Sequence, residues 1–400
     1  MTNNTKDLKS PHDNWVATHI ASLPKSGIRD FFELVNAMDD VISLGIGEPD
    51  FATPWHIREA AIYSLEKGHT SYTSNLGLLQ LRKSVCDYVA TNYSVNYKPE
   101  NECIITVGVS EALDLLLRAI INPGDEIIYH EPCYVSYSPC IKMAFGIPVI
   151  VPTFECDEFS LDPEKLLNAV TERTKAILLN FPCNPTGATM PAKQLQEVAE
   201  IAKKHDLIII TDEIYSELNY DGNHISIASL PGMKERTVFL HGFSKAYAMT
   251  GFRIAYACGP KEIIDAMMKI HQYSMLCAPT IAQEAAVEAL ANGENEMITM
   301  RDSYKDRRNV IVKRLNAMGL NCFTPKGAFY VFANITSTGL SSEDFSTRLL
   351  KEQNVAVVPG TAFGVCGEGF VRCAYATSLD EIQTAMDKIE IFLKSLNNAE

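Results

Sequence analysis

The strongest signal in the hydrophobic pattern is a series of short, almost wholly apolar runs in the middle of the chain. They lie at residues 103–107, 126–130, 148–152, 176–180, 207–211, 237–241 and 253–258. Such runs are typical of strands that are buried on both faces of a sheet. Segments with helical spacing of apolar residues separate several of them, at 110–121, 137–145, 163–170 and 191–205. The alternation predicts an α/β fold whose large domain has a mostly parallel seven-stranded sheet, covered by helices on both faces.

The pattern changes on either side of this region. Before it, helical spacing appears at 26–37, 55–67 and 77–92, with a short apolar run at 41–44. After it come helical segments at 261–291 and 295–318, a hairpin-like segment at 322–335, a helix at 342–352, strands near 355–358 and 369–375, and a helix at 379–396. Because strands and helices no longer alternate regularly there, we expect a smaller α+β domain. Residues 1–14 are expected to form a flexible polar arm.

Composition narrows the class of protein. The 400 residues exceed what one core usually supports, and the net charge of −14 argues against nucleic acid or an anionic membrane as a partner. No apolar run approaches the ~18 residues that a membrane helix needs, and the polar start MTNNTKDLKS lacks the apolar part of a secretory signal. Eleven cysteines without a C-x-x-C pair indicate reduced thiols in a cytoplasmic protein. Nine histidines without a cluster indicate no metal site.

The stretch HGFSKAYAMTGFR at 241–253 carries the first candidate chemistry. Lys245 follows a predicted buried strand, where desolvation and nearby charge can lower the pKa of an amine. Such an amine can form a Schiff base with an aldehyde, while Ser244 and Arg253 suit a phosphate group. An aldehyde joined to a phosphate describes pyridoxal 5′-phosphate (PLP). A solvated surface lysine beside a structural arginine is the alternative for this stretch alone.

Other predicted strands also end in polar or aromatic residues, at the edge where ligands bind in sheets of this type. After the first strand, a helix is expected to begin near Ser110, Glu111 and Ala112. Its free N–H groups suit a phosphate, and an ordinary N-cap serine is the compatible alternative. After the second strand, Tyr134 could lie flat on a cofactor ring or be a core residue.

Three later segments add an amide, a carboxylate with a nearby hydroxyl, and a guanidinium. Asn184, between two prolines, could donate to a ring oxygen or a carboxylate, or only make a turn. Asp212 ends an apolar strand and needs a partner if buried, such as a pyridinium nitrogen, unless it caps a helix. Tyr215 could reach the neighbouring ring hydroxyl. Arg372, flanked by apolar residues, suits a bidentate anion or an internal salt bridge.

Together, these residues and their order resemble the class I/II, fold-type I PLP-dependent aminotransferases, in the branch with prokaryotic aspartate and aromatic aminotransferases. The resemblance runs from about residue 25 to residue 396. The motifs that carry it are GEPDF (47–51), SYTSNLG (71–77), NPTG (184–187), DEIY (212–215), SKAYAMTGFR (244–253), GAFYVF (327–332), VVPGTAFG (357–364) and FVRCAYA (370–376). Two further segments, SGIRDFFELV (26–35) and IHQYS (270–274), resemble the branch that acts on N-acetyl-diaminopimelate.

The resemblance implies that this chain binds PLP. Lys245 would carry the Schiff base and move the substrate proton, and Asp212 would pair with the pyridine nitrogen. Tyr215 and Asn184 would hold the ring oxygen, and Tyr134 would stack on the ring. The phosphate would be held by the backbone of Ser110, Glu111 and Ala112, together with Ser244 and Arg253.

The resemblance also implies a substrate site and a homodimer. Arg372 would bind the α-carboxylate of an amino acid, and Tyr134, Asn184 and the Gly47 backbone would complete the substrate site. Tyr72 would reach the phosphate of the partner subunit.

Two further expectations follow from the same resemblance. Residues 15–45 and 293–400 would form the smaller domain from both chain ends, beside a large PLP-binding domain at 46–292. Gly242 departs from the family, because some relatives carry a phosphate-binding serine at that position.

The implied activity is transfer of an amino group from an L-amino acid to a 2-oxo acid such as 2-oxoglutarate, by a ping-pong mechanism. Aspartate, aromatic and diaminopimelate-type donors all remain open. A PLP-dependent carbon–sulfur β-lyase would use the same constellation of residues. A non-catalytic PLP-binding regulatory protein is a third alternative, but it would usually carry a DNA-binding domain or lack a catalytic residue.

Overall fold

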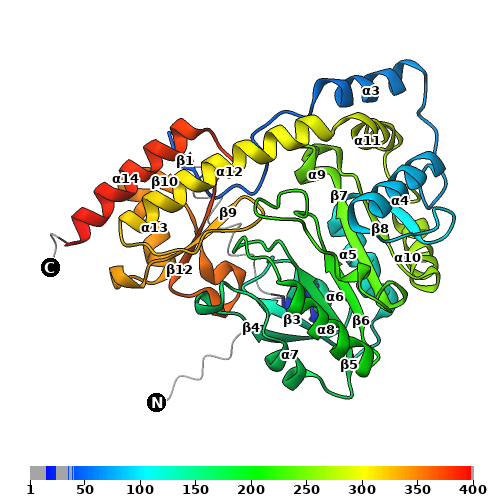
Figure 1. Cartoon of the computed structure of the whole chain (residues 1–400), viewed down its shortest axis with the longest axis horizontal. Helices are drawn as coiled ribbons and strands as arrows, with labels where there is room; N and C mark the ends of the chain where they lie inside the picture. Colours follow the sequence, from blue (N-terminus) through cyan, green and yellow to red (C-terminus); the bar gives the residue numbers. More distant parts are fainter. Residues whose placement is uncertain (1–14, 24–34, 36–37, 39, 398–400) are drawn as a thin grey trace, which may run out of the picture.

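The computed structural model describes residues 15–23, 35, 38 and 40–397. The expected arm at 1–14 lies outside the described residues, as does nearly all of the expected helix at 26–37. Within the described part, a seven-stranded sheet with its helices forms one region, and a three-stranded sheet with the long helix α12 (Glu294–Ala317) forms another (Figure 1).

The central sheet has the strand order β2-β8-β7-β6-β5-β3-β4. Its strands are β2 (Cys103–Thr106), β3 (Glu126–Glu131), β4 (Ile147–Pro152), β5 (Thr174–Asn180), β6 (Ile208–Asp212), β7 (Thr237–Gly242) and β8 (Ala255–Cys258). All pairs are parallel except those of β8, which runs antiparallel to both β2 and β7. This confirms the predicted mostly parallel sheet. The connection between β7 and β8, at 243–254, holds only the four-residue helix α9 (Phe243–Ala246) and a short 3₁₀ turn.

Helices cover both faces of this sheet, because successive strand residues point to opposite sides. Ile127 belongs to the core under one face and Ile128 to the core under the other. The first face is covered by α5 (Gly108–Ile120), α6 (Tyr137–Met143) and α10 (Lys261–Ser274). The second is covered by α4 (Leu79–Tyr93), α7 (Pro163–Ala169), α8 (Ala192–Lys204) and α11 (Thr280–Asn292), and α3 (Trp55–Glu66) packs against α11.

The second region has its own sheet, with the antiparallel order β11-β12-β9. Its elements are β9 (Tyr330–Asn334), β11 (Val358–Pro359), β12 (Phe370–Ala374), α12, α13 (Ser342–Gln353) and α14 (Leu379–Asn397). A two-stranded parallel pair, β1 (Ile42–Ser43) with β10 (Val355–Ala356), joins the beginning of the described chain to this region. The domain boundaries themselves stay a prediction.

The hairpin expected at 322–335 is wrong. β9 is a single strand that pairs with β12, and Gly327 instead bridges to Asn219 in the loop after β6. The apolar segment therefore has its strand partner about 40 residues farther along the chain, a long-range pairing that local spacing does not reveal. No helix among the described residues is both long and apolar enough to cross a membrane.

Candidate active site

A cavity of about 370 Å³ lies at the carboxyl ends of the parallel strands, between the central sheet and strands β9 and β12. Ten predicted site residues line it: Gly47, Ser110, Tyr134, Asn184, Asp212, Tyr215, Ser244, Lys245, Arg253 and Arg372. The other lining residues are Gly45, Glu48, Val109, Leu113, Tyr137, Asn180, Ile214, Thr250 and Tyr330. The volume is that of a small-molecule site, and the lining combines aromatic side chains with a few convergent polar groups.

Three predicted residues do not line this cavity. Ala112 is buried in the core under α5. Glu111 turns away, so that one oxygen accepts from the Val107 N–H and the other lies 2.9 Å from His271 Nδ1. Tyr72 is 81% exposed, and its reach into a partner subunit stays a prediction.

Lys245 presents its amine to the cavity from the short helix α9 (Phe243–Ala246), directly after β7. Its Nζ donates to the Gly47 carbonyl at 2.7 Å. Burial lowers the pKa of Lys245 to about 8, although the Glu48 carboxylate acts in the opposite direction. About a tenth of the amine is therefore unprotonated at pH 7, far more than at the ordinary pKa of a lysine, and the unprotonated form is the one that acts as a nucleophile or a general base.

Asp212 is a buried carboxylate at the end of β6. Its two oxygens accept from Tyr137 Oη at 2.8 Å and from the Ile214 N–H at 3.2 Å. Burial raises the pKa of Asp212 to about 6, even though both hydrogen bonds lower it. Asp212 caps no helix in the described chain, because turns follow it directly. A cation placed against this carboxylate would relieve the cost of its burial.

Arg372 lies at the opposite wall, on β12, with its guanidinium between two aromatic rings. The centres of the Tyr330 and Phe363 rings lie 4.4 and 4.8 Å away. One terminal nitrogen donates to Asn184 Oδ1 at 2.9 Å, and the other donates to the Gly45 carbonyl. The buried Nε has no partner among the described residues. This geometry leaves donors for an incoming carboxylate and does not support the alternative of an internal salt bridge.

Asn184 and Tyr215 are held by neighbours in the same wall. The backbone N–H of Asn184 donates to Asn180 Oδ1 at 3.1 Å, and the Asn180 amide donates to the Asp212 carbonyl at 2.9 Å. The hydroxyls of Tyr215 and Tyr330 lie 2.8 Å apart. These contacts fix the positions of an amide and a phenol in the cavity that Asp212 also lines.

The start of α5 forms one end of the cavity, which Val109 and Ser110 line. The helix begins at Gly108 rather than at Ser110, so the expectation that it starts at the serine is wrong by two residues. Gly108 has a φ of +78°, and a Cβ there would lie 2.5 Å from Arg253 Nη2. The missing side chain therefore lets a guanidinium pack against the helix N-terminus. Free N–H groups and a guanidinium together suit a phosphate, with Ser110 and Ser244 at the border.

The glycine at 242 has a steric reason. It pairs with Ala255 in the β7–β8 ladder, and a Cβ at 242 would lie 2.6 Å from the Ala255 Cβ. A serine cannot take this position unless the neighbouring strand moves.

Sequence reasoning missed several residues that shape the cavity. Tyr137 holds Asp212, Asn180 holds Asn184, and Tyr330 contacts both Tyr215 and Arg372. Asn180 was detectable, because it ends a predicted strand as Asp212 does.

Comparison with known proteins gives one consistent result. The family model "Aminotransferase class I and II" matches residues 39–389. The YugH protein of Bacillus subtilis (strain 168), which is named as an aminotransferase without a stated substrate, is 51% identical over 95% of this chain and 98% of its own length. An aspartate aminotransferase of Pyrococcus abyssi is 45% identical over 92% of this chain and 96% of its own. The crystal structure of an aromatic aminotransferase from Pyrococcus horikoshii OT3 has a TM-score of 0.88 and 45% identity, and the match covers 92% of this chain and 99% of the other.

Proposed function

We propose a specific activity for this chain on the premise that it belongs to the aminotransferase class I and II family and is an aminotransferase. In this proposal the cavity holds PLP, and the enzyme moves the amino group of an L-amino acid to a 2-oxo acid such as 2-oxoglutarate, in two half-reactions. The observation that carries the proposal is the convergence of Lys245, Asp212 and Arg372 on one cavity.

The residues present fit PLP on three independent grounds. The buried Asp212 carboxylate suits a protonated pyridine nitrogen, and the N-terminus of α5 with Arg253 suits the phosphate. The Lys245 amine suits the aldehyde, with Tyr215 and Asn184 beside the ring oxygen and Tyr134 against the ring. When bound, PLP would supply an aldehyde for the amino group and a ring that accepts the electron pair left on the substrate Cα.

Side chains of the protein would bind the substrate and transfer its proton. Arg372 would bind the α-carboxylate through its unpaired Nε and a terminal nitrogen, with Asn184 and the Gly47 backbone fixing its orientation. The Tyr330 and Phe363 rings exclude water from this ion pair. Lys245 Nζ would take the proton from the substrate Cα and then give it to the cofactor carbon that bears the amino group, because its lowered pKa makes both steps accessible near neutral pH.

We also propose a homodimer in which Tyr72 reaches the phosphate site of the partner subunit. Support for a partner comes from the 81% exposure of the Tyr72 side chain.

The donor amino acid is the open part of the proposal. Relatives of this chain are named aspartate and aromatic aminotransferases. Lys245, Arg253 and Arg372 are the three Lys or Arg residues that line the described cavity, and each already has a proposed role.

The test combines a lysine variant with a donor screen. Lys245→Ala should lower turnover by at least the roughly 10²–10⁴-fold of a lost acid–base group. The exposed Lys193→Ala is the matched control. Borohydride should fix PLP covalently to Lys245 in the parent protein, as read by mass spectrometry of the peptide.

The screen follows glutamate formed from 2-oxoglutarate with aspartate, phenylalanine, tyrosine, alanine or N-acetyl-diaminopimelate. One strongly preferred donor would identify the substrate. Release of pyruvate and ammonia from a cysteine conjugate, without any 2-oxo acid, would favour the carbon–sulfur β-lyase instead. A parent protein that binds no PLP would overturn the proposal.

A further inference from the structure

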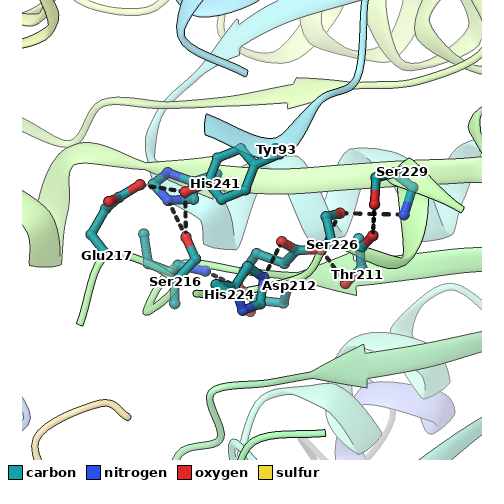
Figure 2. Close-up of polar contacts among 12 residues, drawn as sticks. Tyr93, Thr211, Asp212, Ser216, Glu217, His224, Ser226, Ser229 and His241 are labelled. Carbon is teal, nitrogen blue, oxygen red and sulfur yellow. Dashed lines mark hydrogen bonds and ion pairs between the residues drawn. The ribbon is translucent and has the colours of Figure 1, made fainter. Parts of the chain in front are cut away.

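A second carboxylate is buried directly behind Asp212, on the opposite side of the chain. Glu213 is 1% exposed. Its Oε1 accepts from Thr211 Oγ1 at 2.9 Å and from Ser226 Oγ at 2.7 Å, and its Oε2 lies 2.6 Å from His224 Nε2. Figure 2 shows Thr211, His224 and Ser226 gathered beside Asp212. Among the described residues no lysine or arginine pairs with Glu213, so His224 is its one ionisable donor.

The same segment is fixed at two further points. The Glu213 N–H donates to the Leu240 carbonyl on β7 at 2.9 Å, two residues before the turn that leads to the candidate lysine. Ser216 Oγ lies 2.7 Å from Tyr93 Oη and 2.8 Å from His241 Nε2, as the dashed lines in Figure 2 show. Residues 213 and 216 are thus anchored in the interior on the side away from the cavity, whereas the intervening Ile214 and Tyr215 line it.

We propose that Glu213 and His224 are positioning residues for the aminotransferase reaction, a hydrogen-bonded pair that holds Asp212 and Tyr215 against the cofactor. The inference rests on the proposed function. The Asp212 side chain has only a tyrosine hydroxyl and one backbone N–H of its own, so its place relative to β7 depends on the backbone on either side. The pair fixes that backbone from behind by tying it to the loop at 224–229.

The Glu213 carboxylate matters electrostatically as well as through its geometry. It raises the pKa of Asp212, and His224 is the partner of its Oε2. His241 is the other imidazole in the network. It stays neutral, because burial lowers its pKa to about 3. Tyr93, whose ring lies 5.9 Å from the His224 ring, is neutral too, because burial raises its pKa. Loss of the His224 imidazole would leave the buried Glu213 Oε2 without its hydrogen-bond partner, next to Asp212.

The experiment is a double-mutant cycle on the apoprotein, with the affinity for PLP measured by calorimetry and turnover measured separately. We expect His224→Gln to weaken PLP binding about 10-fold and Glu213→Gln to weaken it less. The double variant should bind more tightly than His224→Gln, because a neutral amide at 213 removes the buried carboxylate that His224→Gln deprives of its partner. The variants should lower kcat more than they raise KM for the donor, because Arg372, which is proposed to bind the donor carboxylate, is unchanged in them. The control is His56→Gln, which breaks a 2.8 Å contact with Glu288 outside the cavity.

Three results would overturn the inference: His224→Gln with the parent's PLP affinity, a double variant as weak as the product of the two single effects, or an equal loss in the His56→Gln control. If His224→Gln does not fold, the double variant decides, because it must retain affinity within a few-fold of the parent. A parent protein that binds no PLP would instead refute the proposed function. Parent-like affinity in all variants would refute only the positioning role.

Discussion

Replacing Asp212 with asparagine separates what this residue does for stability from what it does for function. The carboxylate is 5% exposed, and burial raises its pKa from 3.8 to about 6. An asparagine oxygen can accept from the Ile214 N–H, and the Tyr137 hydroxyl can turn to accept from the amide nitrogen. The substitution therefore removes a buried charge while both hydrogen bonds and the packing remain.

The two pKa values give the magnitude. Their difference corresponds to ~3 kcal/mol at 25 °C. The folded protein binds this proton more tightly than the unfolded chain does. The stabilisation that the bound proton gives to the folded state is therefore fully present below pH 3.8 and is lost as the pH rises through about 6. At pH 8 the ionised carboxylate costs the apoprotein ~3 kcal/mol, and at pH 5 roughly half of that. We expect Asp212→Asn apoprotein to exceed the parent in the free energy of unfolding by these amounts.

The assay is urea unfolding of both apoproteins at pH 8 and pH 5, with the exposed Asp306→Asn on α12 as the control. Turnover of the PLP-loaded Asp212→Asn enzyme should fall by about 10²-fold or more, because the charge opposite the ring is lost. Equal unfolding midpoints for parent and variant at pH 8 would refute the reasoning. A gain of the same size at both pH values would refute it as well, since the gain must follow the titration of the carboxylate.

Two other substitutions test the cofactor side of the cavity. Gly108→Ala should lower PLP affinity about ten-fold, because the new Cβ would lie 2.5 Å from the Arg253 guanidinium, whereas Gly124→Ala, with a positive φ but open space, should leave it unchanged. Titration of the apoproteins with PLP measures both, and equal losses would show that backbone strain alone is responsible. Tyr137→Phe removes a donor that lowers the pKa of Asp212, so PLP affinity should fall several-fold at pH 6 and recover toward pH 8. A loss that does not depend on pH would contradict this cause.

Much of the fold could be predicted from the sequence because its strands are buried on both faces and carry continuous apolar runs. The same runs also led to Asp212 and Lys245 as candidate site residues, since both follow predicted strands, and both line the cavity. The direction of β8 and the partner of β9 could not be predicted, because both depend on contacts between distant segments.

The residues that hold the site were harder to predict than the residues that face it. Tyr137 and His224 carry no local pattern that marks them. Each acts only because the fold brings it to a carboxylate on another part of the chain, 75 residues away for Tyr137 and 11 for His224. Glu213 directly follows Asp212, yet the alternation of a strand turns the two side chains to opposite sides.

The contact between Gly242 and Ala255 constrains the order in which substitutions can accumulate in this chain. A hydroxyl-bearing residue at 242 would collide with the Ala255 methyl group as soon as it appeared. A descendant could therefore gain a serine there only if strand β8 moved or if position 255 first lost its side chain, and the second route passes through an intermediate with glycine at both places. The packing of β7 against β8 thus makes the tolerated substitutions at 242 depend on the residue that already occupies position 255.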